Sequence, residues 1–186
     1  LQAAVEGGYE RIVKLLLDNG ADISLEGRLF IDSFNSNTPL CAASWNGYEG
    51  IVKLLLERGA DVEEQGACGN ALTLAADQGH DNIVKILLAH GADINAQFDK
   101  ASGHYGSALQ AAAAMNCAPI VQILLEHGAN VNAQGGWYGT VLRAAVEQGS
   151  VQVVEMLLSQ EDIDVNVRRN QYGEDNSLMA AAEKGY

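Results

Sequence analysis

The sequence predicts an all-α protein built from a repeated pair of short helices. Three observations support this fold class. A leucine that opens a short alanine-rich segment recurs at positions 1, 40, 72, 109, 142 and 178, a period of about 33 residues with short insertions. An apolar segment of the Ile-Val…Leu-Leu type follows the leucine in all but the last copy, and a glycine closes most segments. Each copy therefore predicts a helix, a turn and a second helix.

The first helix of each copy has a recognisable start and end. A short polar residue stands two places before the leucine in five copies: Thr38, Asn70, Ser107, Thr140 and Asn176. The side-chain oxygen of such a residue accepts a hydrogen bond from a helix N–H that is otherwise unpaired. The helix is expected to end at a glycine in a left-handed conformation, or at Asn116 in one copy.

The second helix of each copy carries most of the apolar side chains. Ile51-Val52 with Leu54 to Leu56 is one example, and Ile83-Val84 with Ile86 to Leu88 is another. One helix pair alone is too small to cover this apolar face, so neighbouring pairs are expected to stack on one another.

These segments resemble the ankyrin pattern Thr-Pro-Leu-His-x-Ala-Ala…Gly-His…Ile-Val…Leu-Leu…Gly-Ala-Asp-Val-Asn, over essentially all 186 residues. The resemblance implies an ankyrin-repeat solenoid of stacked helix–turn–helix units with projecting finger loops, about five repeats in a single array. The expected units are 1–36 (partial), 37–69, 70–106, 107–139, 140–175 and 176–186 (partial), so the array is expected to be truncated at both ends. The linker 133–139 and the opening at Ala108 also resemble arrays of large fungal NACHT-type signalling ATPases.

One position departs from the ankyrin pattern in every copy. The histidine of the first helix is replaced by another residue throughout: Gln2, Cys41, Thr73, Gln110, Arg143 and Met179. The resemblance therefore does not say which hydrogen bonds take the place of those that this histidine makes.

Charge and cysteine content narrow the class of partner. The net charge is −13, which disfavours nucleic acid and anionic membrane surfaces and favours another protein with a basic or neutral surface. The cysteines Cys41, Cys68 and Cys117 are odd in number and widely spaced, which predicts neither a disulfide framework nor a zinc cluster. Reduced thiols and an intracellular, cytoplasmic location are therefore expected.

Residues capable of chemistry mostly recur at fixed repeat positions, which favours a role in the scaffold. Asp22, Asp61 and Asp93 follow Gly-Ala and suit turns that need a short acceptor. His90 and His127 share one place late in the second helix, where a charged imidazole favours the helix end. No catalytic, metal or cofactor-binding residues are predicted, and the chain is not expected to be an enzyme. A site in the long linkers is the remote alternative.

The candidate partner contacts are aromatic residues and one histidine in the linkers and at one helix end: Phe34, Trp45, His104, Tyr105, Trp137 and Tyr138. Aromatic side chains are common anchors of protein interfaces. Two alternatives stay open. The Tyr-Gly pairs that recur at 105, 138 and 172 also suit packing within a finger, and the array also suits self-association or autoinhibition of a larger signalling protein.

Overall fold

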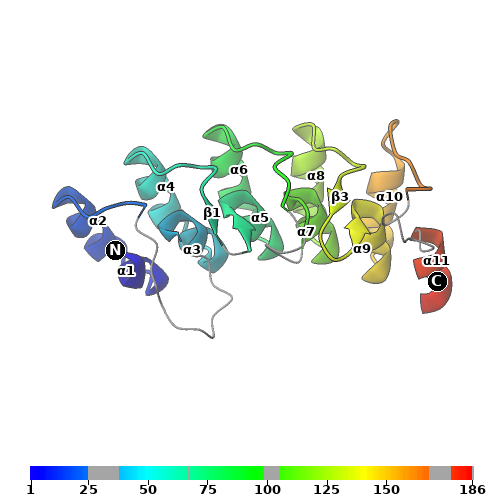
Figure 1. The fold of residues 1–186 in the computed structure, drawn as a ribbon, viewed down its shortest axis with the longest axis horizontal. Helices are drawn as coiled ribbons and strands as arrows, with labels where there is room; N and C mark the ends of the chain where they lie inside the picture. Colours follow the sequence, from blue (N-terminus) through cyan, green and yellow to red (C-terminus); the bar gives the residue numbers. More distant parts are fainter. Residues whose placement is uncertain (25–37, 67, 99–104, 168–176, 186) are drawn as a thin grey trace. The chain divides into compact units, whose positions relative to one another are not determined.

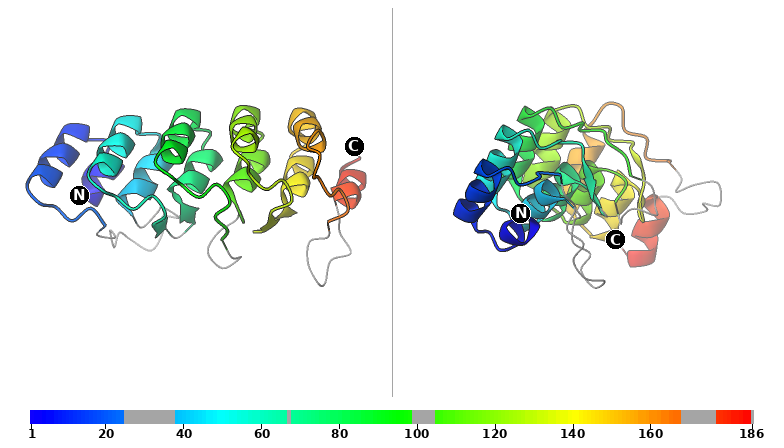
Figure 2. Two further views of the ribbon diagram at one scale, coloured as in Figure 1. Left: turned by 90° about the horizontal axis from the view of Figure 1, so that it is seen from above. Right: turned by 60° about the vertical axis from the view of Figure 1, so that its left-hand side comes forward.

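The computed structural model describes residues 1–24, 38–66, 68–98, 105–167 and 177–185. The chain divides into two compact units, Leu1–Asp93 and Ile94–Tyr186. Both units are built from pairs of short helices, which Figure 1 and Figure 2 show from different sides. The helix pairs predicted from the repeat are confirmed.

The described residues of the first unit form three helix pairs. They are α1 (Gln2–Glu6) with α2 (Glu10–Asp18), α3 (Pro39–Asn46) with α4 (Glu49–Glu57), and α5 (Ala71–Asp77) with α6 (Asp81–Ala89). Helix α3 packs between α1 and α5, and α4 packs between α2 and α6. The first helices therefore form one layer of this unit and the second helices form another.

The second unit repeats this arrangement. Its helices are α7 (Ala108–Ala114), α8 (Ala118–Glu126), α9 (Val141–Glu147), α10 (Val151–Leu158) and α11 (Ser177–Lys184). Helix α9 packs between α7 and α11, and α10 packs on α8. Figure 1 shows α11 beside α9 at the red end of the chain.

Capping side chains fix the start of the first helices. The side-chain oxygens of Thr38, Asn70, Ser107 and Thr140 accept hydrogen bonds from the backbone N–H three residues later. The capping predicted for these four residues is confirmed, and Asn176 lies outside the described residues. At the other end of α7, Asn116 has φ of 55°, the left-handed conformation that glycine adopts in the other copies.

Both helices of each pair contribute to the core, and the second helices supply most of its large aliphatic side chains. In α4, Ile51, Val52, Leu55 and Leu56 are buried, a spacing that places all four on one face of the helix. Leu55 and its counterparts Leu87, Leu124 and Leu157 have no exposed surface. Complete burial of a leucine side chain contributes about 2 kcal/mol to folding, so each of these four leucines stabilises the unit in which it lies.

Two short antiparallel hairpins precede first helices. Strand β1 (Gln65–Gly66) pairs with β2 (Gly69–Asn70), with Gln65 opposite Asn70. Strand β3 (Gln134–Gly135) pairs with β4 (Gly139–Thr140), with Gln134 opposite Thr140. Each hairpin ends on the residue that caps the following helix, so the finger and the first helix are positioned together.

Candidate functional site

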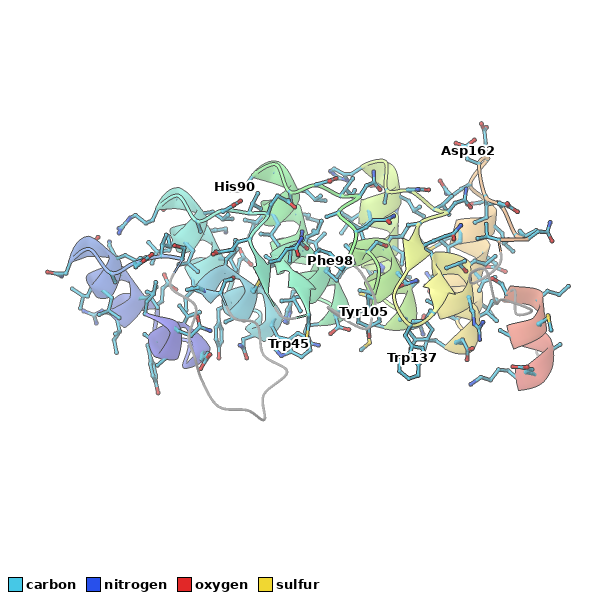
Figure 3. All side chains as sticks on the ribbon, viewed as in Figure 1. Trp45, His90, Phe98, Tyr105, Trp137 and Asp162 are labelled. Atoms are coloured by element: carbon cyan, nitrogen blue, oxygen red, sulfur yellow. The ribbon has the colours of Figure 1, made fainter. Side chains whose placement is uncertain are left out.

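The aromatic residues that the structure describes in the second unit lie at its fingers. The β3–β4 hairpin carries Trp137 and Tyr138 in its loop, and Tyr105 lies in the preceding finger, just before α7. The Tyr105 and Tyr138 rings stack with centroids 6.3 Å apart and an interplanar angle of 10°. Trp137 is 67% exposed, and Figure 3 shows its ring projecting away from the helices. Two neighbouring fingers therefore form one continuous platform.

Each tyrosine of the platform also contacts the end of the following first helix. The Tyr105 hydroxyl donates to Met115 Sδ at 3.6 Å, and Gln148 Nε2 donates to the Tyr138 hydroxyl at 3.3 Å. Met115 and Gln148 occupy equivalent places, each ten residues after its tyrosine. The platform therefore extends from the fingers to the ends of α7 and α9.

A glutamine in α7 holds the two fingers together. Gln110 Oε1 accepts from the Gly106 N–H at 2.6 Å, and Gln110 Nε2 donates to the Gly135 carbonyl at 3.1 Å. Gln110 is one of the residues that replace the first-helix histidine, so it supplies hydrogen bonds at the position where the resemblance left them undefined. A Cβ on Gly106 would lie 2.7 Å from the Gly135 backbone, and only glycine permits this approach.

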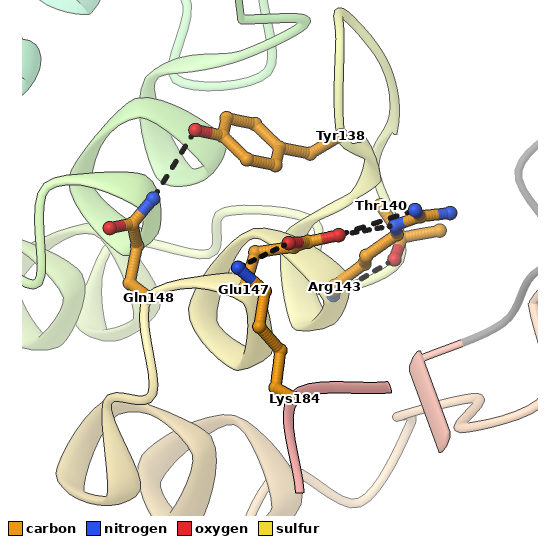
Figure 4. Close-up of polar contacts among 6 residues, drawn as sticks. All are labelled: Tyr138, Thr140, Arg143, Glu147, Gln148 and Lys184. Atoms are coloured by element: carbon orange, nitrogen blue, oxygen red, sulfur yellow. Dashed lines mark hydrogen bonds and ion pairs between the residues drawn. The ribbon is translucent and has the colours of Figure 1, made fainter. Parts of the chain in front are cut away.

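A polar pocket of about 350 Å³ adjoins the platform. Its lining consists of Trp137, Tyr138, Arg143, Glu147, Gln148 and Lys184. The Arg143 guanidinium contacts Glu147 Oε1 at 3.2 Å, and Lys184 Nζ lies 3.5 Å from Glu147 Oε2 (Figure 4). Two cations from α9 and α11 therefore share one carboxylate beside an exposed indole.

The remaining predicted contacts lie apart from this platform. Trp45 is half-buried near the end of α3 in the first unit, and its carbonyl is 3.1 Å from His80 Nε2. Phe34 and His104 lie outside the described residues. The structure thus brings Tyr105, Trp137 and Tyr138 together. Tyr105 and Tyr138 stack on each other across two neighbouring fingers, so packing within a single finger stays a prediction, as does partner binding by the six residues.

The recurring polar residues belong to the scaffold, as the repeat pattern predicted. Asp22 Oδ1 and Asp61 Oδ1 accept hydrogen bonds from the backbone N–H two residues later. His90 Nδ1 and His127 Nδ1 lie 2.8 and 2.7 Å from the carbonyl four residues earlier in their helices. Within the described part of the chain, no group of three or more His, Cys, Asp or Glu residues is arranged to hold a metal ion.

Links between neighbouring turns are a feature that the sequence did not reveal. Asn132 Oδ1 accepts from the Asp164 N–H at 2.8 Å, and Asn132 Nδ2 donates to the Asp162 carbonyl at 2.6 Å. Asn95 Oδ1 accepts from the Asn130 N–H at 2.8 Å in the same way, and Glu63 Oε1 accepts from the Asp93 N–H at 2.7 Å. Glu63 therefore joins two repeats.

Burial controls the reactivity of two cysteines. Desolvation raises the pKa of the Cys41 thiol to about 11, because that side chain is fully buried beneath β1 and β2. Desolvation also raises the pKa of Cys68, with a smaller contribution from the Asp77 carboxylate. Both thiols are therefore poor nucleophiles at neutral pH.

Comparison with known families agrees with this architecture. The family described as ankyrin repeats (3 copies) matches residues 1–66, 63–135 and 109–186. The chain belongs to the ankyrin-repeat family. Ankyrin repeats are generally protein–protein interaction modules, and the family is typically non-enzymatic. No curated protein matches the sequence.

In the described ranges, none of the helices combines the length and apolar character that crossing a bilayer requires.

Proposed function

We propose that this chain is a protein-binding module whose main contact surface is the aromatic platform of the second unit, formed by Tyr105, Trp137 and Tyr138. The observation that carries the proposal is the 67% exposure of Trp137 beside a stacked tyrosine pair. Exposing a large aromatic side chain to water is unfavourable, so a partner that covers this side chain gains binding free energy. The tyrosine pair is held by helices and fingers, so it is already ordered before binding.

The proposal includes further contacts and features from the sequence. Trp45, Phe34 and His104 are additional contacts, and about five repeats make up the array. The partner presents a largely basic or neutral surface, because the net charge of −13 attracts such a surface over long range. An intracellular location and a place in a larger protein similar to fungal NACHT-type signalling ATPases are hypotheses on the same footing.

The test replaces the exposed indole. Trp137→Ala should weaken the binding affinity for a partner isolated by pull-down by about tenfold or more, the usual effect of removing an aromatic anchor. Trp45→Ala should weaken it to a smaller extent because Trp45 is half-buried. Helicity, measured by circular dichroism, should stay unchanged in both variants. The matched control is Tyr9→Ala, another exposed aromatic at 59%, which lies in the first unit. Binding that is unchanged by Trp137→Ala would contradict the proposal.

Self-association is the second candidate function, and one observation favours it. Ile12 of α2 is 48% exposed, whereas its counterparts Ile51, Ile83 and Ile120 are at most 2% exposed. Ile12 belongs to the first helix pair, against which the described residues place no preceding pair, so a second copy is one way to cover its exposed side chain. The sedimentation coefficient should then rise with concentration, and Ile12→Glu should abolish the rise. A concentration-independent value for the unmodified chain would exclude self-association.

A further inference from the structure

The pocket beside Trp137 differs in charge from the other described residues of its unit. In the described residues of the second unit, the cationic side chains are Arg143 and Lys184, and both line this pocket. The carboxylates of the same residues number seven: Glu126, Glu147, Glu155, Glu161, Asp162, Asp164 and Glu183. Only Glu147 of these seven lines the pocket. The described part of this unit therefore has both of its Lys and Arg side chains at one place, next to the exposed indole of Trp137.

The ion pairs in the pocket determine which guest charge it favours. Among the described side chains that line the pocket, Glu147 faces two cations, so the charges of these three side chains sum to one positive unit. A guest ammonium or guanidinium would meet this excess positive charge, whereas a guest carboxylate would be attracted by it. Figure 4 shows Arg143 and Lys184 approaching Glu147 from different sides.

Lys184 is able to respond to such a guest. Its side chain is 48% exposed, and its ammonium lies 3.5 Å from Glu147, so the contact is loose. The ammonium has three hydrogens and is able to keep this contact while donating to a second carboxylate. Arg143 is different, because its side chain is only 10% exposed and is held against Glu147. Arg143 supplies fixed positive charge, and Lys184 supplies the adjustable donor.

We propose that this pocket accepts an acidic side chain of a partner's peptide segment, while a neighbouring aromatic or aliphatic residue of that segment rests on Trp137 and Tyr138. This inference rests on the proposed function and names the partner's local chemistry. The partner carries an Asp or Glu next to an apolar anchor, within a surface that is otherwise basic or neutral. Lys184 and the platform then select the segment together.

The experiment uses the intact chain and a phage-displayed library of random peptides. Selected peptides should be enriched in Asp or Glu adjacent to an aromatic or aliphatic residue. Lys184→Gln should lower the affinity for these peptides by about fivefold, which is the scale of one partly exposed ion pair. Replacing the peptide's Asp by Asn should lower its affinity for the unmodified chain by a similar factor. The unmodified chain and the Lys184→Gln variant should then bind the Asn peptide equally well. The matched control is Lys85→Gln, because Lys85 also lies 3.5 Å from a carboxylate and is 55% exposed.

The outcomes separate this inference from the proposed function. Peptides that lose affinity with Trp137→Ala but not with Lys184→Gln, or that are rich in Lys and Arg, would overturn the acidic-residue inference and leave the platform in place. A selection that yields no peptide dependent on Trp137 would overturn both.

Discussion

At the scale of single residues, short polar side chains at helix starts define where each first helix begins. Thr140 links the β3–β4 hairpin to α9, because it ends the strand and its hydroxyl accepts from the Arg143 N–H at 3.1 Å. The same residue therefore positions Trp137 and Tyr138 relative to Arg143. A stability change at this cap reports directly on the scaffold beneath the candidate site.

Thr140→Ala should reduce the free energy of unfolding by about 1 kcal/mol, because a buried helix N–H loses its acceptor. Urea denaturation followed by circular dichroism measures the change. Thr140→Ser keeps the hydroxyl and should recover most of the loss. Equal destabilisation by serine and alanine would show that the methyl group, rather than the cap, is what matters.

Cys41 is a second residue whose behaviour follows from its surroundings. With a pKa of about 11 against an ordinary value of 9.0, its thiolate fraction at pH 8 is about 100-fold lower in the folded chain than in the unfolded one. Iodoacetamide should therefore label Cys41 far more slowly in buffer than in urea, as followed by mass spectrometry. A similar rate in both conditions would contradict the buried environment.

Because folding raises the pKa of the Cys41 thiol, the contribution of this thiol to the free energy of unfolding is complete below pH 9 and is lost as the pH rises towards 11.

At the scale of elements, hydrogen bonds between neighbouring turns join one repeat to the next. Asn132→Ala removes the bonds to the Asp164 N–H and the Asp162 carbonyl, and should lower the stability of the second unit by about 1–2 kcal/mol. Hydrogen exchange of the amides of α10 measures the loss. Asn166→Ala, at the equivalent place one repeat later, serves as the matched control. If both substitutions had the same effect, the bridge from Asn132 would not be what stabilises this junction.

The elements were largely predictable from the sequence, because their causes are local. Capping by Thr38 or Ser107 and the left-handed turn at Asn116 depend on residues within a few positions of one another. For the platform, the sequence indicated which aromatic residues take part but not how they contact one another. The stacking of Tyr105 on Tyr138 depends on the close approach of Gly106 and Gly135, and a single repeat gives no sign of that contact. The pocket was missed because Arg143, Glu147 and Lys184 come from two helices, and a charged residue at a helix end is ordinarily solvated.

At the scale of the whole molecule, repetition separates scaffold from function. Side chains that recur, such as Asp61 and His90, hold turns and helix ends. Side chains that do not recur, such as Trp137 and Lys184, lie where neighbouring fingers and helix ends meet. In the proposed function, the acidic background would favour a basic or neutral partner at long range. The proposed pocket would add a short-range preference for one acidic residue, so that approach and recognition would depend on different parts of the partner.

The central claim is that the platform of the second unit is where a protein partner binds. Hydrogen–deuterium exchange of the chain, alone and with a partner isolated by pull-down, tests it most directly. Slower exchange is expected in residues 105–116 and 134–148, which contain the stacked tyrosines, Trp137 and the helix ends beneath them. Slower exchange confined to α8 and α10, with no change in those two segments, would contradict the account.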